Sequence, residues 1–219
     1  MTNTSKRYPV IYFNDAQNIF EGWKAPFGVG WEVHNSMLQL RQEGYQEAIL
    51  IGIEHGRKHR QSEYVPLNRN GKFLMDGNHF SDFIANDLKP FVDKKLRTIP
   101  WRENTAIVGS SLGAISALYT GLKHQDVFSK IGAFSPSFWI IPPLYDLTLK
   151  VGKHYDTQLF LSCGAQEGQS TINNTKNYYH TLIKAGYNES EIFFLIKKNG
   201  KHNELLWQSL FRDFYKWSM

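Results

Sequence analysis

The sequence predicts an α/β fold in which helices cover both faces of a mostly parallel central sheet. Short, continuous apolar runs of strand length recur at residues 8–13, 47–53, 105–108, 130–134, 158–162 and 191–197. Longer segments, most with helical spacing of apolar residues, separate these runs. Strands that alternate with helices form parallel sheets that are buried on both faces, which explains why the strand runs are apolar throughout.

The segments with helical spacing predict helices at residues 31–41, 80–96, 112–123, 172–185 and 202–217. Pro90 is expected to break or kink the second of them, because proline lacks the amide hydrogen. Gly186 is expected to end the fourth as a left-handed cap. Residues 54–76 are polar and contain Pro66 and Gly71, so they predict a long loop. Residues 135–145 are rich in proline and aromatic side chains.

Length and composition predict one domain that spans residues 1–219. The 219 residues, 42% of them hydrophobic, are enough for one well-buried core. The net charge of +5 is a mild excess, and its densest cluster, Arg57-Lys58-His59-Arg60, falls in the predicted loop. A nucleic-acid binder gathers basic residues into a stripe, so we interpret this cluster as a solvated loop and expect no nucleic-acid partner.

The sequence predicts neither a membrane segment nor a metal site. Its apolar runs are too short to cross a bilayer, and its first residues lack the apolar segment of a signal peptide. We therefore expect a cytoplasmic protein without a membrane partner. Cys163 is the only cysteine, and no group of His, Asp or Glu has metal-ligand spacing, so we expect no metal and no cofactor.

The segment Gly109-Ser110-Ser111-Leu112-Gly113 predicts a nucleophile elbow centred on Ser111. In such an elbow a strand runs into a sharp turn and a helix leaves it, so small residues are needed on both sides. Residues 105–108 supply the strand, and the small residues that follow Leu112 suit a helix packed close to the sheet. The amide of Leu112 would then be one oxyanion donor. Ser110 is the rival nucleophile but lacks the central position.

A serine nucleophile needs a histidine base, and in this fold the chain order is serine, acid, histidine. His202 follows the last predicted strand and is therefore the expected base. His124 and His180 fall in predicted helices, and His154 precedes a strand, which is the wrong edge of the sheet.

The acid should follow the preceding strand, which makes Glu167 the leading candidate. Asp146, Asp156, Glu189 and Glu191 are alternatives less well placed in the chain order. Cys163 could be a nucleophile instead, but no histidine lies near it in sequence.

Four further motifs resemble the putative-esterase family, which includes enterochelin esterases, esterase D, feruloyl-esterase-like enzymes and mycolyltransferases. They lie at residues 8–20, which contain Asn14-Asp15-Ala16-Gln17-Asn18, and at residues 60–66, 134–139 and 200–207, the last containing Gly200-Lys201-His202-Asn203-Glu204. The resemblance covers nearly the whole chain and implies an α/β-hydrolase fold with N-terminal strands shortened or absent. Ala16 and Ala114 stand where the family has glycine.

The resemblance also implies roles for individual residues. It gives Ser111 and His202 as the catalytic pair with Glu167 as the acid, in agreement with the chain order. It implies a second oxyanion donor in the amide of Gln17 or Ala16. Asp15 and Trp139 are implied to line the site.

Together these patterns predict a serine hydrolase that cleaves small-molecule carboxylic esters through an acyl-enzyme. Acyl transfer to an alcohol, as in the mycolyltransferases, is the alternative enzyme activity. A binding scaffold without catalysis is the alternative from another class, although relatives of that kind typically lack the nucleophile. Trp31, Phe138, Trp139 and Tyr145 could form an aromatic pocket, although core packing is the better expectation for each.

Overall fold

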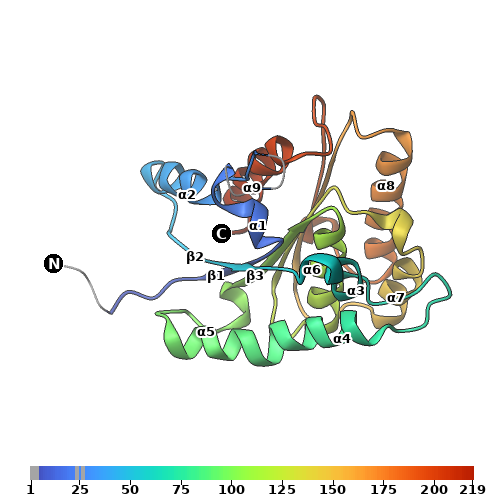
Figure 1. Cartoon of the computed structure of the whole chain (residues 1–219), viewed down its shortest axis with the longest axis horizontal. Helices are drawn as coiled ribbons and strands as arrows, with labels where there is room; N and C mark the ends of the chain where they lie inside the picture. Colours follow the sequence, from blue (N-terminus) through green and yellow to red (C-terminus); the bar gives the residue numbers. More distant parts are fainter. Residues whose placement is uncertain (1–4, 23–24, 26–27) are drawn as a thin grey trace.

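A six-stranded, all-parallel sheet forms the centre of the protein, as a computed structural model shows for residues 5–22, 25 and 28–219 (Figure 1). The strand order is β2-β1-β3-β4-β5-β6. The strands are β1 (Val10–Asn14), β2 (Ile49–Ile53), β3 (Thr105–Ser110), β4 (Lys130–Phe134), β5 (Gln158–Gly164) and β6 (Ile192–Lys197). Each predicted apolar run forms one strand, and the sheet is fully rather than mostly parallel.

Helices cover both faces of the sheet (Figure 1). On one face lie α1 (Ala16–Ile19), α2 (Val33–Gln42) and α9 (Glu204–Ser218). The other face is covered by α3 (Arg60–Tyr64), α4 (Met75–Asp82), α5 (Lys89–Lys95), α6 (Leu112–Lys123), α7 (Leu144–Val151) and α8 (Gln169–Lys184). Alternate residues of one strand enter the two cores: Ile11 and Phe13 pack with α2 and α9, whereas Tyr12 packs on the other side.

The prediction of a long loop at residues 54–76 is wrong in part. This segment contains a 3₁₀ turn at Arg57–His59 and helix α3, and α4 begins inside it at Met75. Helix α3 buries only Tyr64, so its five residues carry no apolar periodicity that a sequence could reveal. Helix α7 was not predicted either, because it follows Pro142 and Pro143, although proline suits the start of a helix.

The predicted helix 80–96 belongs to a continuous helical run from Met75 to Lys95, and Pro90 does not break it. A π-helical segment, Phe83–Leu88, separates α4 from α5, and Pro90 lies at the start of α5. The π-helical segment directly before α5 accommodates the missing amide hydrogen of Pro90 without ending the helical run. Gly186 has φ of 100° after α8, and the amide of Tyr187 donates to the carbonyl of Leu182, as in a Schellman cap.

Candidate active site

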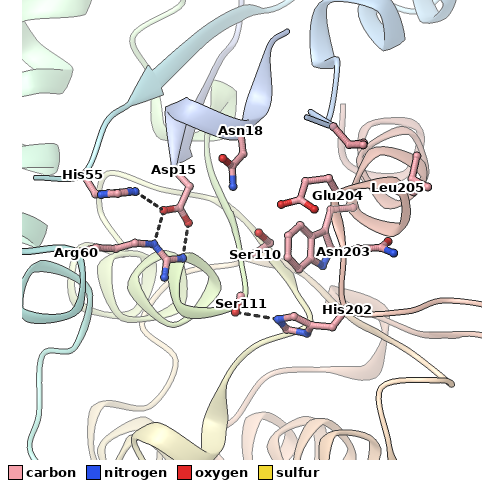
Figure 2. A pocket seen from close by; sticks show the side chains of 12 residues that line it. Asp15, Asn18, His55, Arg60, Ser110, Ser111, His202, Asn203, Glu204 and Leu205 are labelled. Atoms are coloured by element: carbon pink, nitrogen blue, oxygen red, sulfur yellow. Dashed lines mark hydrogen bonds and ion pairs between the residues drawn. The ribbon is translucent and has the colours of Figure 1, made fainter. Parts of the chain in front are cut away.

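The carboxyl ends of all six strands meet at one edge of the sheet, and a pocket of about 630 Å³ opens there. Its walls include Asp15 after β1, Arg60 after β2, Ser110 and Ser111 at the end of β3, and His202 and Glu204 after β6 (Figure 2). Ligand sites of open α/β sheets lie at this edge because loops from several strands converge there. The pocket therefore lies at the carboxyl ends of the strands, where the chain order predicted the site.

Ser111 lies at a sharp corner between β3 and α6. Its φ of 54° and ψ of −120° are unusual for a residue with a side chain, a conformation that costs about 1–3 kcal/mol. The flanking elements impose it: the amide of Ser111 donates to the carbonyl of Phe134 at 2.9 Å, and α6 begins at the next residue. The corner turns the hydroxyl of Ser111 into the pocket (Figure 2).

The two glycines of the elbow are required by close packing. A Cβ on Gly109 would lie 2.2 Å from the carbonyl oxygen of Gly113, which is backbone and has little freedom to move. A Cβ on Gly113 would lie 2.5 Å from a carboxylate oxygen of Asp15. The glycine spacing thus reflects the approach of α6 to β3 and to the segment after β1.

Ser111, His202 and Glu167 form a continuous hydrogen-bonded chain. The Nε2 atom of His202 lies 2.9 Å from the Oγ of Ser111, and its Nδ1 lies 2.7 Å from Oε2 of Glu167. A proton on Nδ1 that donates to the carboxylate leaves Nε2 as the acceptor for the serine proton. The structure therefore brings the three predicted residues together in one hydrogen-bonded chain.

Glu167 is held by two further hydrogen bonds. Its side chain is only 1% exposed, and Oε1 accepts from the amide of Gly164 at 2.6 Å and from the Oγ of Ser135 at 2.6 Å. The Oγ of Ser135 in turn accepts from Nε1 of Trp207 at 3.0 Å. Donors on Oε1 stabilise the ionised carboxylate and leave Oε2 directed at the histidine.

Ser135 was not singled out from the sequence, and it lies directly after β4 within the motif at residues 134–139. We expect Ser135→Ala to lower kcat/KM for ester hydrolysis about tenfold, because the hydrogen bond that the Ser135 hydroxyl donates to the buried carboxylate of Glu167 is lost. Ser135 has φ of 50°, so Ser135→Gly is the matched variant that removes the hydroxyl without backbone strain. Equal rate losses in the two variants would identify the hydroxyl as the cause, whereas a loss in alanine alone would contradict this role.

The rival residues lie away from this chain of hydrogen bonds. Asp146 and Asp156 are exposed, and Glu191 is paired with Lys153. His154 and His180 are exposed, and His124 contacts Asp82. Cys163 is fully buried in β5, and burial raises the pKa of its thiol, which disfavours the reactive thiolate.

The predicted oxyanion residues lie after two neighbouring strands, β3 and β1. Leu112 is the first residue of α6, and Ala16 and Gln17 open α1, after the neighbouring strand β1. The first amides of a helix have no acceptor within the helix. The amide of Asp15 differs, since it donates to the hydroxyl of Tyr64 at 2.9 Å. The methyl group of Ala16 lies over Gly52, where an added Cβ would come within 2.9 Å of it.

Asp15 lines the pocket as part of an ion-paired group (Figure 2). Its carboxylate accepts from Nε of Arg60 at 2.6 Å and from its terminal nitrogen at 2.8 Å, and His55 lies 3.7 Å away. Burial opposes the charge of Arg60, but the bonds to Asp15 raise the pKa of the guanidinium overall. Arg60 therefore belongs to the site, which corrects the prediction that its basic cluster is only a solvated loop.

Trp139 lies beside the site but outside the pocket wall. Its ring centroid is 6.4 Å from that of His202, and the residue is 47% exposed. Trp31 and Phe138 are fully buried, and Tyr145 packs against Phe138 and Tyr178. These three aromatic residues are thus core rather than pocket.

The described part of the chain contains neither a metal-binding cluster nor a helix that could span a membrane. No group of three or more His, Cys, Asp or Glu side chains within residues 5–22, 25 and 28–219 is arranged to hold a metal ion. None of the helices in that part of the chain is long and apolar enough to cross a membrane.

Comparisons with known proteins agree with this architecture. The uncharacterized protein YbbA of Bacillus subtilis (strain 168) is 23% identical over 223 residues, which cover 96% of this chain and 85% of YbbA. The iron(III) salmochelin esterase of Escherichia coli O6:H1 is 25% identical over 183 residues, covering 75% of this chain and 41% of that protein.

Solved structures show the same fold. A ferulic acid esterase superimposes with a TM-score of 0.71 at 21% identity, covering 99% of this chain and 86% of that one. The enterochelin esterase from Shigella flexneri gives a TM-score of 0.74 at 22% identity, covering 97% of this chain and 51% of that one. These similarities, with the parallel sheet and the strand-to-helix corner, establish the α/β-hydrolase fold. Because the family model described as Putative esterase matches residues 2–212, the chain belongs to the Putative esterase family.

Proposed function

We propose that the protein hydrolyses carboxylic esters of small molecules through Ser111, His202 and Glu167. Membership of an esterase family supports ester hydrolysis as the activity. One observation carries the finer proposal: the unbroken chain of hydrogen bonds from Ser111 Oγ through His202 to the buried Glu167, at 2.9 and 2.7 Å.

In this mechanism His202 takes the proton of Ser111 as its Oγ attacks the acyl carbonyl carbon. The amides of Leu112 and of Gln17 or Ala16 donate to the oxyanion of the tetrahedral intermediate. His202 then gives its proton to the leaving alkoxide, and the alcohol departs from an acyl-enzyme. A water molecule, deprotonated by His202, attacks the acyl carbon, and the acid is released with Ser111 regenerated.

Glu167 stays ionised throughout and stabilises the imidazolium that forms in each half-reaction. Its two other donors, Ser135 and the Gly164 amide, keep the carboxylate in place. The acid therefore fixes the tautomer and the orientation of His202, and the proton travels only between Ser111, His202 and the substrate.

Covalent labelling tests this proposal directly. A fluorophosphonate reacts with an activated serine but not with an ordinary one. We expect one equivalent of probe per chain, located on the peptide that contains Ser111 by mass spectrometry, and no labelling of the His202→Ala variant. Labelling of another serine, or none, would contradict the proposal and favour a scaffold without catalysis.

A further inference from the structure

Glu204 presents an unpaired carboxylate to the pocket. It is the first residue of α9, two residues after His202, and is only 5% exposed. Among the described residues no hydrogen-bond donor and no cation contacts its side chain, although the other two carboxylates of the site are both paired. The carboxylate oxygens are not among the fully buried polar atoms, so they face the space of the pocket, where a donor group of a bound molecule can reach them.

The groups opposite Glu204 are polar. In Figure 2 the carboxylate points across the pocket toward Asn18, whose amide nitrogen is directed into the same space, with Ser110 below them. The Oδ1 atom of Asn18 is buried and has no partner in the described part of the chain. An acceptor, an amide donor and a hydroxyl thus meet around one region of the pocket.

We propose that this region binds a hydroxyl group of the ester substrate, which donates to Glu204 and accepts from the amide of Asn18. A hydroxyl is both donor and acceptor, so it pairs with Glu204 and with the amide nitrogen of Asn18, whereas an ammonium group only donates and would leave that amide nitrogen without an acceptor. Val29 and Leu205 line the same pocket and offer apolar contact to a carbon skeleton that carries the hydroxyl. This inference rests on the proposed function and adds its substrate class, a hydroxylated ester.

Matched esters test the inference. One series consists of p-nitrophenyl esters of cyclohexanecarboxylic acid that bear a hydroxyl, a methoxy or an ammonium group trans to the carboxyl carbon. A second series places the same groups on the alcohol, in cyclohexyl acetates, so that either side of the ester is sampled. We expect kcat/KM for the hydroxyl ester to exceed that for the methoxy ester about tenfold or more in one series, because methoxy cannot donate to Glu204.

Variants of Glu204 and Asn18 test whether these two residues cause the preference for the hydroxyl ester over the methoxy ester. In Glu204→Leu we expect the hydroxyl-to-methoxy ratio to fall to about one. Glu204→Gln keeps an acceptor and should retain part of the ratio, and Asn18→Ala should lower it as well. Glu189→Leu is the matched control, since Glu189 is exposed and precedes β6, at the opposite edge of the sheet; its ratio should equal that of the wild type. Thermal unfolding of each variant checks that it is folded.

Each outcome decides the inference. A wild-type ratio near one in both series, or a ratio that survives in folded Glu204→Leu and Asn18→Ala, overturns it while ester hydrolysis stands. A preference for the ammonium ester over the hydroxyl ester also overturns it, in favour of a cation site. If Glu204→Leu does not fold, the ratios of Glu204→Gln and Asn18→Ala decide. Absence of hydrolysis of every ester would instead refute the proposed function, and the inference with it.

Discussion

Replacement of Ser111 by alanine is expected to lower kcat/KM for p-nitrophenyl acetate by a factor of about 10⁴ or more. The variant lacks the Oγ atom that attacks the acyl carbon, so only the oxyanion donors and substrate binding remain, and these alone give little turnover. Alanine carries the same backbone strain as serine at φ of 54°, so the fold should be retained. Initial rates measured with a thermal unfolding curve separate loss of chemistry from loss of structure.

Ser116→Ala provides the control for this experiment. Ser116 is buried in α6, and its substitution makes the same chemical change away from the pocket wall. We expect its activity to stay within a few-fold of the wild type. Hydrolysis by Ser111→Ala at more than about a hundredth of the wild-type rate would refute the assignment of the nucleophile.

Glu167→Gln is expected to lower kcat/KM by a factor of about 10³–10⁴. The reason lies in the hydrogen bonds that surround the carboxylate. Oε1 accepts from the Gly164 amide and the Ser135 hydroxyl, so the oxygen of the glutamine must take that position. The amide nitrogen then faces Nδ1 of His202, which must become an acceptor. The proton moves to Nε2, and the histidine can no longer accept from Ser111.

The tautomer explanation can be separated from simple loss of charge. Glu189→Gln removes a charge from an exposed position and should leave the rate unchanged. In Glu167→Gln the fold should be preserved, because the amide keeps the size and shape of the carboxylate, and nitrogen NMR shifts of His202 should show the proton on Nε2. A proton still on Nδ1, or a rate within tenfold of the wild type, would contradict this account.

Chain order alone predicted which residues meet at the site. Ser111, Glu167 and His202 each follow a strand, and parallel strands bring their carboxyl ends to one edge whatever the details of packing. The apolar runs that form the strands are equally visible in the sequence, because strands buried on both faces need apolar residues throughout. The parallel sheet, though not the order of its strands, and the meeting of these three side chains at one edge were therefore predictable.

Two other side-chain contacts between distant segments were not predicted. The bond from Ser135 to Glu167 and the pairing of Arg60 with Asp15 join residues 32 and 45 positions apart. No local periodicity encodes such contacts, since they depend on how loops turn after each strand. Helix α3 was missed for a related reason: it is short, and only Tyr64 is buried.

The residues proposed to react with the substrate and those proposed to select it come mostly from different parts of the sheet. Ser111, Ser135 and Glu167 follow the adjacent strands β3, β4 and β5, whereas Asn18, His55 and Arg60 come from segments after β1 and β2, on the other side of β3. In the proposed mechanism the segment after β2 can therefore be exchanged to change selectivity without touching the reacting groups, whereas the segment after β1 also carries the proposed oxyanion donors Ala16 and Gln17. His202 lies in the loop before α9 and Glu204 is the first residue of that helix, so a substitution that alters the proposed selectivity group can also displace the proposed base.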